Sequence, residues 1–249
     1  MRLKSKLSVP LIILSFLVAS CASKRADQVL SIAEQLKSDK AKAEGLAREF
    51  TRRVTFVNMP KAEKFLNSMA LQLARQEPGF ENEPVQIKVH DDRPPGQHQF
   101  FSFPGTFISI PQSFLKQVEF ENELAAAISY ELANVLNRYL AAKVENLGAS
   151  PPVLFGPKNL FDLNNAERAQ SIKRGIRLLY LGGYDPRGMP SIFRRFPDYY
   201  ASSASGLFKK QVDFNVREAQ RAKSEFLPSL KPIVRSGEFI QFKNELRKK

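Results

Sequence analysis

Apolar positions recur at helical spacing over most of the chain and alternate with polar positions over one short stretch. That stretch, residues 85–89, reads Val-Gln-Ile-Lys-Val and indicates a half-buried strand. Two further short strands are expected at residues 100–103 and 106–110, joined through Pro104 and Gly105. Helices are expected at residues 60–76, 112–118, 121–143, 167–181, 186–196, 213–224 and 236–247. The pattern therefore predicts an α+β fold that is mainly helical, with a small sheet.

The first twenty residues have the pattern of a cleaved export signal. A basic start at residues 2–6 precedes an apolar run at residues 11–18, which is too short to span a bilayer. The chain then reads Val-Ala-Ser-Cys up to Cys21, which resembles a bacterial lipobox. That resemblance implies that Cys21 carries acyl chains and anchors the mature protein to a membrane. An ordinary secretory signal with a chance cysteine is the alternative.

Two details bear on localisation. Cys21 is the only cysteine in the chain, and its place at the cleavage position favours lipidation. It is followed by Ala22 and not by an aspartate, which by resemblance to sorting signals favours the outer membrane. We therefore expect a lipid-anchored protein on the periplasmic face of a bacterial cell envelope, with residues 22–40 as a polar spacer that merges into a first helix.

Basic residues are concentrated toward the C-terminus. The chain has 38 Lys and Arg against 25 Asp and Glu, a formal net charge of +13. Residues 187–249 hold 14 of the basic and 6 of the acidic residues, so this segment alone carries +8. An exported protein seldom meets nucleic acid, so anionic lipid headgroups or acidic envelope polymers are the expected partners. A solvated basic surface without a partner is the alternative.

The expected helix at residues 121–143 carries a carboxylate within an apolar stripe. At about 100° per residue, Leu124, Ile128 and Val135 fall on one face, with Glu131 in the middle of it. Burying an unpaired carboxylate is costly, so Glu131 is a candidate functional residue.

The residues around Glu131 have the spacing of the zinc motif H-E-x-x-H. In that motif two histidines four residues apart bind zinc, and the glutamate is the general base. Here the five residues read Tyr-Glu-Leu-Ala-Asn, so Tyr130 and Asn134 stand where the motif has its histidines.

Three separated segments extend this match. Residues 99–110 read Q-F-F-S-F-P-G-T-F-I-S-I, and residues 122–135 read N-E-L-A-A-A-I-S-Y-E-L-A-N-V. Downstream, Gly175 and the run Gly-Tyr-Asp-Pro at residues 183–186 form the third matching segment. The chain resembles the gluzincin metallopeptidase family that includes the heat-shock protease HtpX and the CAAX prenyl protease. The resemblance covers residues 60–200 and implies a zincin-like domain with a small sheet and an active-site helix.

The zinc ligands of that family are not kept. Its two ligand histidines correspond to Tyr130 and Asn134, and counting back from Gly175 places its third ligand, a glutamate, at Arg168. Only the general-base position, Glu131, matches. Tyrosine and asparagine are poor zinc ligands, and an arginine brings positive charge to a cation site. The resemblance thus implies a peptidase-like domain without zinc that has lost catalysis.

The leading hypothesis is a membrane-anchored binding, adaptor or chaperone-like protein. In the family that the chain resembles, an edge strand pairs with extended substrate, and residues 106–110 correspond to that strand. Such pairing does not require cleavage. The groove implied by the resemblance consists of Pro104, Gly105, Thr106, Phe107 and Ile108.

The alternative is an active metalloendopeptidase that binds zinc through displaced ligands. The chain has only two histidines, His90 and His98, and both precede the active-site helix. The candidate ligands are His98, Glu131, Asp162 or Glu167. A catalytic zinc needs three protein ligands around an open position, which this set supplies only if its members converge.

If the zinc is lost and the fold is kept, the carboxylate of Glu131 needs another positive partner. We expect an ion pair between Arg168 and Glu131, with Tyr130 and Asn134 lining the pocket.

The chain is long enough for one ordinary domain. Four segments are expected: a signal peptide at residues 1–20; a lipidated N-terminus, spacer and first helix at 21–58; a peptidase-like domain at 59–200; and a basic helical extension packed on it at 201–249.

Overall fold

The structure is a computed structural model that describes residues 32–80, 85–105, 107–147, 152–155, 159–201, 207–227 and 231–247. The export signal, Cys21 and Thr106 lie outside the described residues. Within the described ranges, no helix is both long and apolar enough to cross a membrane.

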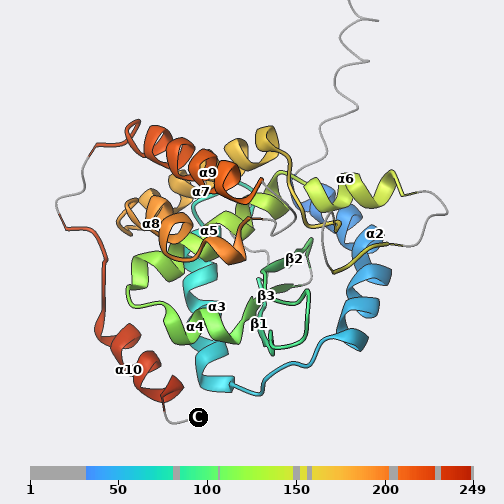
Figure 1. The fold of residues 1–249 in the computed structure, drawn as a ribbon, viewed down its shortest axis with the longest axis horizontal. Coiled ribbons are helices and arrows are strands. Elements are labelled where there is room, and N and C mark those ends of the chain that lie inside the picture. The colour runs from blue at the N-terminus through green and yellow to red at the C-terminus, as the bar shows by residue number, and fades with distance from the viewer. Residues whose placement is uncertain are drawn as a thin grey trace, which may run out of the picture.

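Helices make up most of the described chain and surround one small sheet (Figure 1). In chain order the elements are α2 (Ile32–Arg53), α3 (Pro60–Ala74), β1 (Ile87–His90), β2 (Phe101–Phe103), β3 (Phe107–Pro111), α4 (Gln112–Gln117), α5 (Glu121–Leu136), α6 (Tyr139–Glu145), α7 (Asn165–Leu181), α8 (Gly188–Arg195), the 3-10 helix η1 (Pro197–Tyr199), α9 (Phe208–Lys223) and α10 (Gly237–Leu246). The mainly helical α+β fold expected from the hydrophobic pattern is confirmed.

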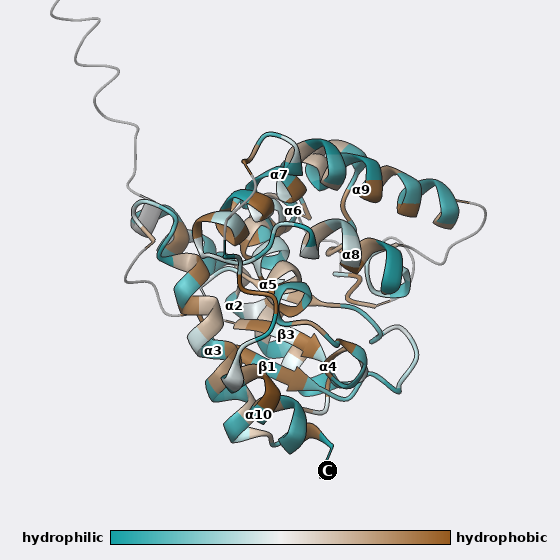
Figure 2. Cartoon of the chain, turned by 90° about the vertical axis from the view of Figure 1, so that its left-hand side faces the viewer, coloured by the Kyte–Doolittle hydropathy of each residue, from teal (hydrophilic) through white to brown (hydrophobic). Residues whose placement is uncertain are grey.

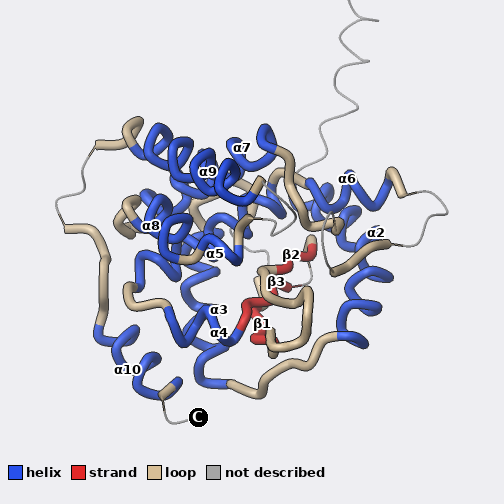
Figure 3. The backbone as a smooth tube through the Cα atoms, viewed as in Figure 1, coloured by secondary structure: helices blue, strands red, loops and turns tan. Residues whose placement is uncertain are grey.

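The sheet has the strand order β1-β3-β2 (Figure 3). β3 runs parallel to β1, with Ile87 opposite Ile108, and antiparallel to β2, with Phe103 opposite Phe107. β3 is therefore the central strand, and all of its residues are buried. The expectation that residues 106–110 form an edge strand is wrong, because β1 comes from a separate segment and occupies that edge.

The expected groove is corrected for the same reason. Phe107 and Ile108 have neighbouring strands on both sides, so their backbone cannot pair with an added peptide. Pro104 and Gly105 form the turn between β2 and β3, where Gly105 has a φ of +60°. A Cβ on Gly105 would lie 3.0 Å from the Cβ of Lys40, so α2 covers this turn. The turn between β2 and β3 is therefore packed against α2 and does not form an open groove.

The side chains of β2 alternate between the two faces of the sheet. Phe101 and Phe103 pack against Phe50 of α2, with ring centroids 4.7 and 4.9 Å apart. Ser102 has the opposite orientation and hydrogen-bonds to Glu131 of α5. One face of β2 is thus closed by an aromatic cluster under α2, and the other faces the helix that carries Glu131.

Two glycines allow the helices around α5 to pack closely. A Cβ on Gly188 would lie 2.2 Å from the carbonyl oxygen of Asn122, and one on Gly175 would lie 3.2 Å from that of Ser129. α8 therefore crosses α5 at a distance that only glycine permits at residue 188, and α7 also approaches α5 closely at Gly175. α9 packs on α7 and α8, and its outer surface is largely hydrophilic (Figure 2).

The described part of residues 201–249 shares the main core. α10 packs on α3 and α4, and its Phe239 and Phe242 are buried beside Phe65 of α3. Ala219 of α9 belongs to the same apolar cluster. The C-terminal helices therefore complete the core that holds the site helices in place.

The helix expected at residues 121–143 is broken. α5 ends at Leu136, and Arg138 adopts a left-handed conformation with a φ of +61° before α6 begins. The Arg138 guanidinium donates two hydrogen bonds to Asp39 of α2, at 2.7 and 2.8 Å. Asp39 is fully buried, so its carboxylate requires this partner. A contact between residues far apart in the chain overrides the local helical pattern here.

Candidate functional site

Glu131 lies inside the protein, at the middle of α5. The residue is 5% exposed, and its carboxylate accepts hydrogen bonds from Ser102 and from the side-chain amide of Asn134, the latter at 3.1 Å. Burial raises the pKa of the Glu131 carboxyl to about 7, although these hydrogen bonds and the positive charge of Arg168 oppose the rise. The hydrogen-bond donors to the carboxylate are thus neutral groups.

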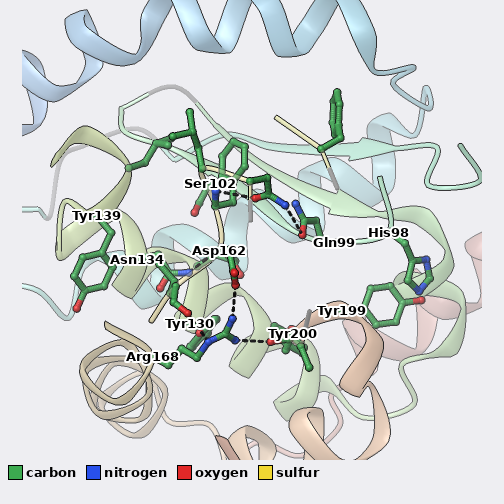
Figure 4. Close-up of a pocket in the computed structure, with 18 of the residues that line it drawn as sticks. His98, Gln99, Ser102, Tyr130, Asn134, Tyr139, Asp162, Arg168, Tyr199 and Tyr200 are labelled. Atoms are coloured by element: carbon green, nitrogen blue, oxygen red, sulfur yellow. Dashed lines mark hydrogen bonds and ion pairs between the residues drawn. The ribbon is translucent and has the colours of Figure 1, made fainter. Parts of the chain in front are cut away.

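Arg168 does not form the expected ion pair with Glu131. Its guanidinium donates to the carbonyl oxygen of Leu163 at 2.8 Å, to that of Tyr200 at 2.5 Å, and to the carboxylate of Asp162 at 2.7 Å. Figure 4 shows Arg168 with dashed lines to Asp162 and Tyr200.

The position of Arg168 in its helix explains this correction. Asn164 and Glu167 form a capping box that starts α7, so Arg168 lies in the first turn. Side chains of a helix tilt toward its N-terminus, which directs Arg168 to the preceding loop and to Asp162. The sequence shows neither this loop contact nor the carbonyl of Tyr200.

A cavity of about 730 Å³ brings the expected site residues together (Figure 4). Its lining includes Tyr130, Glu131, Asn134 and Arg168, so the expectation that Tyr130 and Asn134 line a pocket is confirmed. Aromatic side chains form much of the remaining wall: Tyr139, Phe155, Phe161, Tyr199 and Tyr200. Glu131 and the three residues at the positions that the resemblance compares with zinc ligands therefore line one cavity.

Three buried polar atoms of this lining have no hydrogen-bond partner within the described residues. They are the side-chain amide nitrogen of Gln99, the side-chain amide oxygen of Asn134, and the hydroxyl of Tyr200. Tyr200 is only 6% exposed, and burial, followed by the negative charge of Glu131, raises the pKa of its hydroxyl. Unpartnered buried polar groups are rare in folded proteins, and a bound molecule or water could accept a hydrogen bond from Gln99 and donate to Asn134 and Tyr200.

His98 and Tyr199 lie together at one side of the cavity (Figure 4). Their rings stack with centroids 4.2 Å apart, and the Nδ1 atom of His98 is 2.9 Å from the carboxylate of Asp92. Asp92 also accepts a hydrogen bond from the backbone N–H of Ser113. The carboxylate therefore orients the imidazole through Nδ1 and leaves Nε2 without a hydrogen-bond partner among the described residues. Sequence reasoning missed Asp92, which lies in a segment identified only as a turn.

Three of the candidate ligands of the alternative, zinc-dependent hypothesis have other bonding partners. Asp162 binds Arg168, Glu167 caps α7 and lies 3.5 Å from the ammonium group of Lys143, and His98 binds Asp92. Within the described residues, no group of three or more His, Cys, Asp or Glu side chains is arranged to hold a metal ion.

The site residues present do not fit a zinc ion. Burial raises the pKa of the Tyr130 hydroxyl, which disfavours the phenolate that would bind a metal. Asn134 donates its amide hydrogen to Glu131, and the third position carries the guanidinium of Arg168. Two neutral groups and one cation replace three electron-donating ligands.

The second histidine is structural. His90 is fully buried, with Nδ1 at 2.8 Å from the hydroxyl of Ser109 and Nε2 at 2.9 Å from the carbonyl oxygen of Gln97. Burial lowers its pKa, which favours the neutral ring. Both nitrogens are used within the fold, so His90 supplies no group to the cavity.

Comparison with known proteins adds no family to this description: no family model matches the sequence, and no curated protein matches it.

Proposed function

We propose that this chain is a lipid-anchored protein of the bacterial cell envelope whose gluzincin-like domain binds a ligand without cleaving it. The observation that supports this proposal is the cavity around Glu131, which also contains Tyr130, Asn134 and Arg168. These are the positions that the resemblance assigns to the general base and the zinc ligands.

The chemistry of the cavity argues for binding over hydrolysis. Hydrolysis by such a domain requires a metal ion that activates water, with a glutamate to accept the proton. Glu131 supplies the glutamate, but the residues at the ligand positions are those least suited to a divalent cation. A concave cavity with a partly aromatic lining and a few unpartnered polar atoms is instead typical of a small-ligand or side-chain pocket.

An extended partner would pair at β2 and not at β3. Among the described residues, β2 has a strand neighbour only on the β3 side, and Ser102 from this strand lines the cavity. A bound segment at this edge would place its side chains next to Glu131. An adaptor or chaperone-like role, in which a segment of another protein is held and released, follows from this arrangement.

The remaining parts of the proposal concern attachment. Acylated Cys21 would anchor the protein to the membrane, on the periplasmic face of the outer membrane. The basic residues 187–249 would lie against an anionic envelope surface, because their net charge of +8 attracts phosphate and carboxylate groups. Nucleic acid is not among the proposed partners.

A cleavage assay tests the loss of catalysis. Full-length protein in detergent is incubated with unfolded casein and with a mixed peptide pool, next to the variant Glu131→Gln. We expect no cleavage products above a protein-free control for either protein. Cleavage by the wild type that disappears in Glu131→Gln would overturn the proposal in favour of an active metalloendopeptidase.

A further inference from the structure

The cavity contains a buried carboxylate without a bonded cation. Within the described residues, no lysine, arginine or histidine side chain forms an ion pair with Glu131. Arg168 is close enough to affect Glu131 electrostatically, but its hydrogen bonds go to Asp162 and to two carbonyl oxygens. Asp198 adds a further carboxylate to the lining. With Arg168 balanced by Asp162, the described part of the lining carries a negative charge in a protein whose net charge is +13.

Two uncharged acceptors accompany this carboxylate. The side-chain amide of Asn134 donates to Glu131 through its nitrogen, which fixes its oxygen as a free acceptor in the same cavity. The hydroxyl of Tyr200, on a side chain that is more than nine-tenths buried, has no partner within the described residues. Glu131, Asn134 and Tyr200, which all line the cavity, therefore place three oxygen acceptors in one site, and two of these acceptors have no partner within the described residues.

We propose that the cavity binds a primary ammonium group on an unbranched alkyl chain, held by Glu131, the amide oxygen of Asn134 and the Tyr200 hydroxyl. This inference rests on the proposed binding role of the cavity. An ammonium group has three N–H donors and one positive charge, which match the three acceptors and the unpaired carboxylate. The alkyl chain packs on the aromatic side chains of the lining.

Other ligand charges fit this lining less well. An anion would meet three carboxylates, and the one guanidinium of the cavity already has three acceptors. A neutral alkyl group would leave the buried carboxylate of Glu131 without a positively charged partner. Both a lysine side chain and a free alkylamine carry the required group, and the test separates these two sources.

Isothermal titration calorimetry with the full-length protein in detergent, at about pH 8, tests the inference. The ligands are acetyl-Ala-Lys-Ala-amide, the same peptide with norleucine in place of lysine, and n-butylammonium chloride. We expect the lysyl peptide to bind at least about tenfold more tightly than the norleucine peptide. A lysyl peptide that binds more tightly than n-butylammonium assigns a protein side chain as the ligand, and the reverse order assigns a free amine.

Three variants locate the ammonium group. Glu131→Gln keeps the size of the side chain but removes its charge, and should weaken the lysyl peptide about tenfold or more. Tyr200→Phe removes only the unpartnered hydroxyl and should weaken it about threefold or more, with an unchanged melting temperature. Glu225→Gln removes an exposed carboxylate that follows α9, pairs with Lys173 of α7 and does not line the cavity, and this variant should bind as the wild type does.

Equal affinity for the lysyl and norleucine peptides would overturn the ammonium inference while leaving the proposed binding function intact. Unchanged affinity in Glu131→Gln would also overturn it, as would the absence of binding by all three ligands at millimolar concentration. Failure of the proposed function itself has a different signature, which is cleavage of the peptides by the wild type.

Discussion

Arg168 binds Asp162, with 2.7 Å between Nη2 and the carboxylate oxygen, and so leaves Glu131 with hydrogen bonds from neutral groups only. The guanidinium of Arg168 therefore forms no ion pair with Glu131. It closes the cavity wall by joining the start of α7 to the preceding loop and to the carbonyl of Tyr200. The positive partner of Glu131 is then expected to come from a ligand.

The ion pair between Arg168 and Asp162 predicts how truncation of Arg168 changes the stability of the fold. Arg168→Ala leaves Asp162 without its partner and two carbonyl groups without a donor, and should lower the free energy of unfolding by about 3 kcal/mol. In double-mutant cycles, the coupling of Arg168 to Asp162 should be about 1–3 kcal/mol and should exceed its coupling to Glu131. Urea unfolding of the single and double variants measures both values. A larger coupling to Glu131 would show that the two side chains pair in solution.

A second prediction concerns the pH dependence of stability. The pKa of Glu131 is raised from about 4.5 to about 7, so between these pH values the folded state binds more protons than the unfolded state. The free energy of unfolding should therefore fall as pH rises through this window, by up to about 3 kcal/mol. Glu131→Gln, which does not titrate, should lack this component and should be more stable than the wild type at about pH 8. Equal pH profiles by thermal denaturation would contradict this assignment.

A third prediction concerns Arg138, which has a left-handed backbone and a salt bridge to buried Asp39. Arg138→Ala loses the salt bridge and keeps the backbone strain, whereas Arg138→Gly loses the salt bridge and relieves the strain. Both should be destabilised, and the alanine variant should be about 1 kcal/mol less stable than the glycine variant. Chemical denaturation of the pair checks the order. A more stable alanine variant would mean that residue 138 is helical, as the sequence pattern predicts.

The sequence indicates the elements well and their arrangement less well. The proline at residue 60 and the alternation at residues 85–89 mark local structure, and α3 and β1 form there. Which strand is central depends on the pairing of Ile87 with Ile108, a contact that no local pattern encodes. The break at Arg138 has the same origin, because it follows from a buried carboxylate on α2.

The candidate site was predicted only in part, because some of its contacts also depend on tertiary packing. Spacing along one helix is enough to place Tyr130, Glu131 and Asn134 in a common cavity. The partners of Arg168 lie in a loop whose path is set by tertiary packing, so the expected ion pair with Glu131 was wrong. The sequence pattern does not single out Tyr200, whose hydroxyl lacks a partner among the described residues, because burial without a partner is a property of the folded structure.

A fourth prediction tests the anchor, which lies outside the described residues. Cys21→Ala should abolish lipidation, and the protein should then leave the membrane fraction or remain as an unprocessed precursor. Fractionation at low and high salt, with electrophoretic migration, measures this. Wild-type behaviour of the variant at low salt, with release at high salt, would instead identify the basic residues 187–249 as the membrane contact.

Whether the domain lacks a metal site is tested by the zinc content of the full-length protein, purified without chelator and measured by inductively coupled plasma mass spectrometry. The double variant Tyr130→His with Asn134→His, which restores two ligands, is the matched comparison. We expect far less than one equivalent of zinc in the wild type and a higher content in the double variant. One equivalent of zinc in the wild type, lost on Glu131→Gln or His98→Ala, would contradict the account and establish a metal site built from displaced ligands.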